Sequence, residues 1–408
     1  MVFIPFCALS EAKGMCIKMK YNLSDVKKKV ERVTKTLKCI EPDRIPLHDF
    51  FWAEFISRWV KEKNLPSDTN IYYYYDMDMM VISPNMDPKK KSCQILEKGD
   101  DYTVWKSGFG CTLKKFDYAP MPRYLDFSIK SPDKYESFEF DDPKDKDRYY
   151  NTRQDIISGD GFTPLPSFSK AIEEAKDKIC IFGSVCEGHE ALWRMRGSED
   201  VYMDLATCPE KIKKFVKRIG DFMIEIGKRQ LDEFKDIKGL FIWGDVAYKN
   251  GMLFSPKLWK EIFYPVVKKM CKEFHKRGAI LIYHGCGDSR AILDDLIEAG
   301  IDAYHTLEVK AGMDAVELKK KYKNKLAYLG NMDALNVLPG SKDNIKKDLL
   351  YRLNAAKGGG FMPGADHSVP GNVSAENYDY FISLIKDCGR YPLNLVTKAG
   401  ILGFSNPG

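Results

Sequence analysis

The chain has 408 residues, of which 44% are hydrophobic and 30% are charged, and its formal net charge is +6. This is the composition of a globular protein long enough to bury a sizeable core. The lysine runs lie far apart in sequence, and no apolar stretch approaches the roughly 18 residues of a membrane span, so we expect neither nucleic acid nor membrane among its partners.

The cysteines and the chain ends indicate the setting of the protein. Eleven cysteines without a dense spacing pattern suggest reduced thiols and a cytoplasmic or anaerobic location. The first 19 residues lack the basic start and the cleavage site of a secretory signal. We expect residues 1–20 to be a disordered extension, with Met15 or Met19 as the true start. A single domain is expected over residues 21–395 and a tail over residues 396–408.

The first elements in chain order are a helix over residues 24–39, with Ser24 or Asp25 as its N-cap, a strand over 47–51 and a helix over 53–61. The aromatic runs at 71–75 and 102–105 are typical of strands. Pro, Asp and Lys become frequent after them. We therefore predict an antiparallel excursion near residues 70–150, on the side of a larger fold.

From residue 178 onward, apolar runs of strand length alternate with longer helical segments. The predicted strands lie at 179–183, 239–245, 279–286, 303–306, 326–330 and 360–362, and the predicted helices at 167–177, 209–235, 256–277, 289–299, 314–323, 341–356 and 374–388. Such alternation indicates a parallel sheet covered by helices, and with the early strand it favours an α/β (β/α)8 TIM barrel. An open doubly wound sheet is the alternative. No G-x-G-x-x-G follows an early strand, which argues against a dinucleotide site.

The segment Tyr283-His284-Gly285-Cys286-Gly287 ends the predicted strand at 279–286. Strand side chains alternate between faces, so His284 and Cys286 point the same way and offer zinc one nitrogen and one sulfur ligand. A third ligand is available from Asp366 or His367, after the last strand. The pair alone is equally typical of a buried cysteine beside a hydrogen-bonded histidine.

Polar residues also follow the other strands, where barrel enzymes carry their chemistry. Each of them has a structural alternative: a helix N-cap, an Asx turn, a strand-bound histidine, a loop residue or a surface position. The interpretation as a site therefore depends on their convergence at one edge of the sheet. These residues are Asp245, His305, Glu308, Asn331, Asp333, Asp366 and His367, together with Cys186, Glu187, His189 and Arg194 after the strand at 179–183.

Several motifs in order resemble those of the uroporphyrinogen decarboxylase superfamily, whose members are (β/α)8 barrels. The resemblance covers residues 239–392, with one further match at 42–46. Its motifs are Trp243-Gly244-Asp245, Phe254-Ser255-Pro256-Lys257-Leu258-Trp259, His284-Gly285-Cys286-Gly287, Ala311-Gly312-Met313-Asp314, Leu329-Gly330-Asn331-Met332-Asp333, Gly358-Gly359-Gly360, and His367 followed by Ser374-Ala375-Glu376-Asn377.

The superfamily has two branches, and the sequence is closer to the second. The first is the metal-free decarboxylase, which clamps a tetrapyrrole with an N-terminal arginine stretch; here residues 46–52 stand in its place, and Arg44 alone does not replace it. The second branch moves a methyl group between a corrinoid on a partner protein and a thiol or related acceptor. It uses zinc held by His-x-Cys and a later ligand, usually Cys.

The resemblance to the second branch implies roles for residues of this chain. His284 and Cys286 match the first two zinc ligands, and His367 aligns best with the third. Asp245 would orient the acceptor or take its proton, and Glu308 would support a metal ligand or be a ligand that the substrate displaces. Candidate substrate-binding residues are Arg44, His189, Asn331 and Asp333.

Two alternatives remain beside this interpretation. One is a metal-free decarboxylase of tetrapyrrole biosynthesis in which Asp245 or Asp333 holds the ring nitrogens. The other is a non-catalytic subunit that docks a corrinoid protein.

Overall fold

The computed structural model describes residues 21–119, 121–155 and 163–395. The extension expected over residues 1–20 and the tail expected over 396–408 lie outside the described residues.

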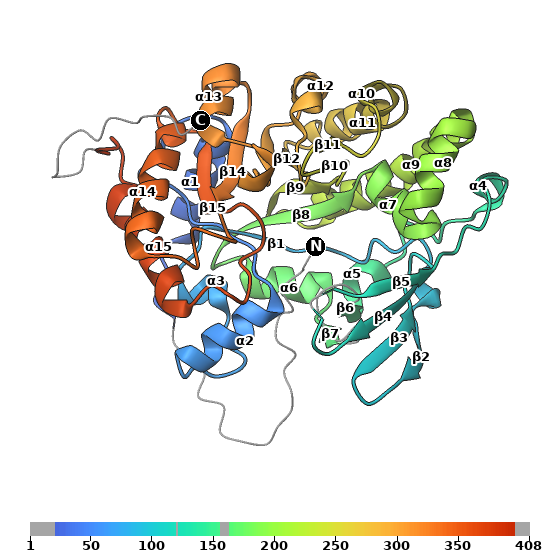
Figure 1. The fold of residues 1–408 in the computed structure, drawn as a ribbon, viewed down its shortest axis with the longest axis horizontal. Coiled ribbons are helices and arrows are strands. Elements are labelled where there is room, and N and C mark those ends of the chain that lie inside the picture. Colours follow the sequence, from blue (N-terminus) through green and yellow to red (C-terminus); the bar gives the residue numbers. More distant parts are fainter. Residues whose placement is uncertain (1–20, 120, 156–162, 396–408) are drawn as a thin grey trace.

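A curled sheet of seven parallel strands forms the centre of the molecule (Figure 1). Every residue of its second and fourth strands is buried, as expected for a parallel sheet with helices on it. Six of the seven strands fall on the predicted apolar runs. In spatial order the strands are β1 Met79–Val81, β8 Cys180–Cys186, β9 Ile237–Trp243, β12 Ile280–His284, β13 Ala303–His305, β14 Ala327–Met332 and β15 Phe361–Ala365.

Helices follow the strands in the predicted alternation. Six of them begin at a Ser or Asp whose side chain accepts a backbone N–H of the first turn, so each start is encoded locally. The helices with these caps are α1 Val26–Leu37, α6 Phe168–Ala175, α10 Pro256–Leu258, α13 Ala315–Tyr322, α14 Lys342–Arg352 and α15 Ala375–Cys388. The other long ones are α2 Ala53–Glu62, α7 Gly188–Arg196, α8 Ser198–Thr207, α9 Pro209–Glu233, α11 Tyr264–His275 and α12 Leu293–Ala299.

The segment over residues 47–51, predicted as a strand, has no regular strand structure but hydrogen-bonds to the regions at both edges of the sheet. The Asp78 N–H, just before β1, donates to the Leu47 carbonyl at 2.9 Å. The Val369 N–H, beyond β15, donates to the Phe50 carbonyl at 2.8 Å, and Phe51 forms a single parallel bridge with Val369. This irregular segment therefore connects the two edges.

The aromatic run predicted as a strand at 71–75 is instead a single helical turn, α3 Ile71–Tyr74. The side chain of Asn70 accepts the N–H groups of Tyr72 and Tyr73 at 3.0 and 3.3 Å and so caps this turn. The local N-cap outweighs the preference of consecutive tyrosines for strands. That preference largely reflects the burial of aromatic side chains, and Tyr72 and Tyr73 are buried in the helical turn as well.

Between β1 and β8 the chain makes the predicted antiparallel excursion, which Figure 1 shows as a separate sheet beside the main one. Its strands are β2 Gln94–Lys98, β3 Tyr102–Lys106, β4 Thr112–Phe116 and β5 Arg123–Asp126. The excursion packs on α7 and α9. The rings of Tyr124 and Trp193 lie 5.2 Å apart, and Arg218 donates to the Tyr135 carbonyl at 2.7 Å.

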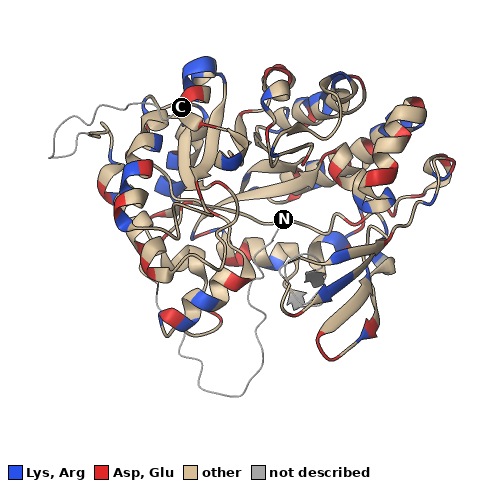
Figure 2. Ribbon diagram, viewed as in Figure 1, with Lys and Arg blue, Asp and Glu red and all other residues tan. Residues whose placement is uncertain are grey.

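Figure 2 shows Lys and Arg mixed with Asp and Glu over the helices of the view, without a large region of one sign. Within the described ranges, none of the helices combines the length and the apolar character that crossing a membrane requires.

Candidate functional site

The end of β12 brings His284 and Cys286 together. The Cys286 Sγ lies 3.5 Å from the His284 Nε2, and His284 is only 3% exposed. Gly287, which follows, has a φ of +78°, and a Cβ there would come within 2.6 Å of the Tyr248 backbone. Glycine therefore permits the tight turn that directs Cys286 back toward the strand end.

Asp245 joins this pair from the end of the neighbouring strand β9. Its Oδ1 accepts the Cys286 N–H at 2.9 Å and lies 3.4 Å from the His284 Nε2. Burial acts to raise the pKa of Asp245. The hydrogen bond and charge of His284 and the Cys286 N–H outweigh that effect, so the pKa lies below its ordinary value. Asp245 is therefore an anion that both orients the turn and faces the histidine.

His305 contacts the other side of the His284 ring. The two residues are paired in the register of β12 and β13, and their Nδ1 atoms are 2.6 Å apart. Burial, followed by the neighbouring imidazoles, holds the pKa of His305 well below its ordinary value, so its ring is neutral. One Nδ1 donates and the other accepts, which leaves the His284 Nε2 facing Cys286 and Asp245.

Glu308 and His367 complete the cluster on the far side of Cys286. Donor atoms of Cys286, Glu308 and His367 all lie within 4.8 Å of one another, and so do those of Asp245, His284 and Cys286. The expected set of His284, Cys286 and His367 does not form such a group among the described residues. Cys286 instead belongs to two sets of donors, and each set also contains one histidine and one carboxylate.

The structure distinguishes the two residues considered as a third ligand. Asp366 is 5% exposed, and its carboxylate accepts the N–H groups of Val309 and Ala334, each at 2.9 Å. Burial raises its pKa to about 6. Asp366 thus connects two loops, whereas His367 lies in the cluster with its ring stacked on Trp52, 5.8 Å between centroids.

The cluster borders a small cavity of about 30 Å³. The donor atoms therefore face a space and are not sealed by packing. The residues that line it are Phe50, Trp243, Asp245, His284, Cys286, His305, His367 and Ser368.

The donor set suits zinc, which takes Cys sulfur, His nitrogen and carboxylate oxygen. Burial raises the pKa of the Cys286 thiol well above its ordinary value, and the carboxylates of Asp245 and Glu308 raise it further. Without a cation the sulfur therefore stays protonated. The same two carboxylates favour a bound cation, which would convert the thiol to a thiolate.

Comparisons with known proteins identify the family of the chain. The model of the family described as uroporphyrinogen decarboxylase (URO-D) matches residues 155–388, more than half of the chain. The chain belongs to the uroporphyrinogen decarboxylase family. The family resemblance inferred from the motifs is therefore confirmed.

One sequence relative of this uroporphyrinogen decarboxylase family protein and one solved structure of similar fold are methyltransferases. A methylated-thiol–coenzyme M methyltransferase of Methanosarcina mazei is 27% identical over 146 residues, which are 35% of this chain and 36% of the relative. The chain thus matches about a third of that relative's length. A solved methyltransferase structure from Methanosarcina mazei has a TM-score of 0.60 at 12% identity and covers 88% of this chain and 98% of its own. At that identity it shows the fold alone.

The four candidate substrate-binding residues of this family member lie outside the cavity lining. Arg44 forms an ion pair with Asp78, 2.7 Å away. Asp78 lies just before β1, at the amino-terminal end of that strand, whereas the cluster lies at the carboxyl ends of its strands. The His189 Nδ1 donates a hydrogen bond to the backbone carbonyl of Asp245, 2.8 Å away. Asp333 accepts the N–H groups of Leu335 and Asn336 in a local turn.

Asn331, the fourth of these residues, is fully engaged inside the protein. It is 0% exposed, its φ is +80°, and its amide donates to the Leu307 and Met313 carbonyls at 2.8 and 2.6 Å. Its oxygen accepts from the Ala315 N–H and from Arg352. Every donor of this amide is used, so Asn331 supports the loop after β13.

Part of the site was not predicted from the sequence. His305 was considered both as a strand-bound structural histidine and as a site residue, and its place at the end of the strand after the His-x-Cys strand is the signal that could have identified it as the register partner of His284. Phe50, Trp243 and Ser368 were not singled out as site residues, because apolar and small residues carry no chemical signature in a sequence.

Glu187, a further residue named from the sequence, caps α7 beside Gly244, and burial raises its pKa to about 8.

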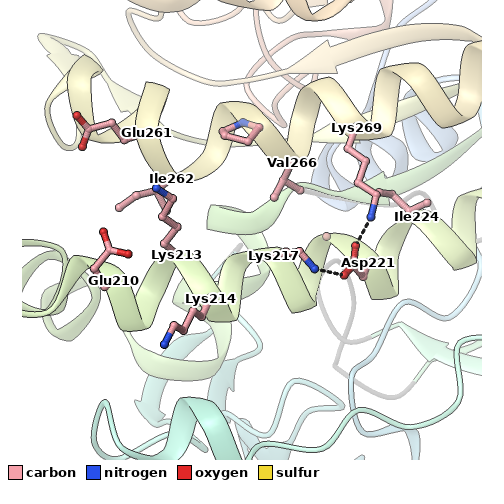
Figure 3. Close-up of a pocket in the computed structure, with 12 residues that line it drawn as sticks. Glu210, Lys213, Lys214, Lys217, Asp221, Ile224, Glu261, Ile262, Val266 and Lys269 are labelled. Carbon is pink, nitrogen blue, oxygen red and sulfur yellow. Dashed lines mark hydrogen bonds and ion pairs between the residues drawn. The ribbon is translucent and has the colours of Figure 1, made fainter.

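A larger hollow of about 370 Å³ lies between α9 and α11, outside the sheet (Figure 3). In it Asp221 bridges Lys217 and Lys269 at 3.1 and 2.6 Å. No histidine or cysteine lines it, so the described residues there offer neither a soft metal ligand nor a nucleophilic sulfur.

Proposed function

We propose that this protein is a zinc-dependent methyltransferase that moves a methyl group between a corrinoid carried by a partner protein and a thiol or related acceptor. The observation that carries the proposal is the cluster around Cys286. The Cys286 thiol, the imidazoles of His284 and His367 and the Asp245 carboxylate line a cavity, and the Glu308 carboxylate lies beside Cys286. Family membership and the methyltransferase relatives support it. We also infer that segment 47–51 occupies the eighth position of a (β/α)8 barrel.

Cys286 would hold the zinc either with His284 and Asp245 or with His367 and Glu308, the two sets whose donor atoms lie within 4.8 Å of one another. A bound zinc ion would act as a Lewis acid that lowers the pKa of an acceptor thiol and keeps it anionic at neutral pH. The hydrogen bond to His305 fixes the orientation of the His284 ring, as partners of metal-binding histidines commonly do.

The protein's own residues would prepare the acceptor for transfer. Asp245, an anion next to His284, can take the proton that the acceptor loses and pass it to solvent. In the transfer a carbon–sulfur bond forms, the bond between methyl and cobalt breaks, and the electron pair of that bond remains on cobalt. Phe50 and Trp243 exclude water from the cavity in which the sulfur lies.

The decarboxylase alternative needs cations that bind a polycarboxylate. Arg44 does not meet that need, because its ion pair with Asp78 holds it at the amino-terminal end of β1, away from the cluster.

An experiment distinguishes the zinc-dependent methyltransferase from the docking subunit. We expect the purified wild-type protein to hold about one zinc per chain by elemental analysis. Cys286→Ala should lose it, and Cys208→Ala, a matched control outside the cluster, should retain it.

The zinc-loaded wild type should then convert methylcobalamin, used as a free corrinoid, to its demethylated form in the presence of a thiol. The change in visible absorption reports the reaction. Full zinc content in Cys286→Ala would refute the assignment of the ligand. A metal-free wild type that cannot be reloaded would refute the proposed function, and a corrinoid-binding but inactive protein would support the docking subunit.

A further inference from the structure

The hollow between α9 and α11 is a narrow slot with an apolar floor. Ile224, Ile262 and Val266 line it, and each of these side chains is at most 6% exposed. The two helices come into close contact there, because a Cβ at Gly220 would lie 2.3 Å from the Val266 Cγ1. Solvent therefore hardly reaches the base of the slot, which is covered by carbon surface.

The slot has the size and the local backbone geometry of a ligand site. Its volume of about 370 Å³ falls within the roughly 300–1,000 Å³ of small-molecule pockets. The wall just before α11 contains a π-helical turn, Trp259–Phe263, which supplies Glu261 and Ile262 to the lining. Such turns are rare in proteins and occur frequently at functional sites. Both features favour a small molecule as the occupant.

One lysine of the rim carries its ammonium group over this apolar floor. Lys213 extends across the slot toward Ile262, whereas the neighbouring Lys214 points away from it (Figure 3). Within the ranges that the structure describes, Lys213 forms no ion pair. An ammonium group above carbon surface favours a ligand that combines an anionic group with an apolar part.

The acidic residues of the rim already have favourable partners. Asp221 binds two lysines of the rim at 3.1 and 2.6 Å. Glu261 lies 4.0 Å from Lys257, which does not line the slot. Glu210 lies in the first turn of α9, where the helix dipole stabilises a carboxylate. Lys213 is therefore the cation that remains available to a ligand in the slot.

We infer that this slot binds a small amphipathic carboxylate, with its alkyl chain on the apolar floor and its carboxylate on the Lys213 ammonium. A cationic ligand would be repelled by Lys213, and an uncharged one would leave it unpaired. A helix of a partner protein, about 10 Å wide, is too broad to reach a floor that is so little exposed. The slot lies apart from the cluster around Cys286, so this inference does not depend on the proposed function.

Octanoate is the probe that tests the inference. Isothermal calorimetry with the full-length wild-type protein should show saturable binding of one octanoate per chain. Butanoate has the same carboxylate but half the chain, and it should bind at least tenfold more weakly, because each buried methylene contributes about fourfold in affinity. Octylammonium, which has the same chain length and the opposite charge, should bind more weakly than octanoate.

Variants at Lys213 locate the carboxylate. Lys213→Met keeps the stem of the side chain and removes its charge, so octanoate should bind about two- to fivefold more weakly, as expected for an exposed ion pair. Octan-1-ol, which is uncharged, should bind the wild type and this variant equally. Lys213→Glu should make octylammonium bind more tightly than octanoate. Lys214→Met and Lys214→Glu are the matched controls, because Lys214 is also exposed but points away from the slot.

Equal affinities for octanoate and butanoate would show that charge alone attracts the ligand, and they would overturn the inference. Equal effects of the Lys213 and Lys214 variants, or the absence of saturable octanoate binding, would overturn it as well. Zinc uptake and methyl transfer concern the cluster around Cys286 and do not enter these titrations. A negative result here therefore leaves the proposed function intact, and the failure of the proposed function leaves this site intact.

Discussion

The Nδ1 atom of His284 lies 2.6 Å from the Nδ1 atom of His305, across the pairing of β12 with β13. Both rings are buried, so the contact is not exchanged for water. It directs the opposite nitrogen of His284 toward Cys286, 3.5 Å away. The orientation of one donor is therefore set by a residue that does not itself belong to either donor set.

This relationship predicts a loss of metal affinity when His305 is changed. His305→Phe keeps a ring of similar shape but removes the hydrogen-bond partner, and we expect zinc to bind about 10–100-fold more weakly. Competition with a chromophoric chelator measures the affinity. His48→Phe serves as control, because the His48 ring lies 6.1 Å from His305 and has no hydrogen bond to His284. Equal affinities in the two variants would contradict the assigned role.

The two neighbours Asp366 and His367 should behave differently when changed. His367→Ala removes a donor of the cluster, so zinc affinity should fall by about tenfold or more. Asp366→Asn should retain zinc but lower the free energy of unfolding by about 1–3 kcal/mol, because it places an amide against two backbone N–H donors. Elemental analysis and urea unfolding measure the two effects. The reverse pattern would make Asp366 the ligand.

Asn331→Ala should destabilise the protein without a specific effect on the metal. The change removes the partner of two buried carbonyls and a buried N–H, takes one of several contacts from Arg352, which keeps its ion pair with Asp314, and puts alanine at a positive φ. We expect a loss of about 3–5 kcal/mol in urea unfolding. Asp333→Ala removes an exposed turn contact and should cost about 1 kcal/mol or less. Similar losses in both variants would show that burial does not decide the effect.

Asp49 predicts a pH dependence of stability. Burial raises the pKa of this carboxyl from 3.8 to about 7 in the folded protein. Between about pH 4 and 7 the folded state therefore holds a proton that the unfolded state has lost, and the stability contributed by Asp49 falls as pH rises through this window. The contribution is at most about 4 kcal/mol.

Asp49→Asn mimics the protonated carboxyl and should flatten this part of the stability curve. Its partners are the N–H groups of Phe50 and Ala365 and the hydroxyl of Tyr378, all of which an amide oxygen or amide group can meet. Urea unfolding at pH 4.5, 6 and 8 measures the slope for wild type and variant. An unchanged slope would place the titration at another group.

The central strands could be predicted because each is a buried apolar run that ends at glycine or a polar residue, as β9 and β12 show. The three-residue strand β1 and the helical turn α3 could not, since one is too short to show a period and the other depends on the Asn70 cap. His284 and Cys286 were found because their spacing carries chemical information.

Other parts of the site depend on tertiary contacts. The role of Arg44 depends on Asp78, which lies 34 residues away in sequence. The division of the cluster into two donor sets depends on the ends of four different strands, β9, β12, β13 and β15. Neither relationship has a signature within one segment, so the sequence pointed to a convergence of residues without specifying its geometry.

The excursion between β1 and β8 leaves and rejoins the main fold through neighbouring residues, since the Asn85 N–H donates to the Arg148 carbonyl at 3.0 Å. It starts from the carboxyl end of β1, and the cluster likewise lies at the carboxyl ends of its strands. Such an appendage can be lengthened, trimmed or exchanged in the course of evolution while every strand that carries a donor stays in place. In this protein the strands that carry the donors and the excursion beside them can thus change independently of each other.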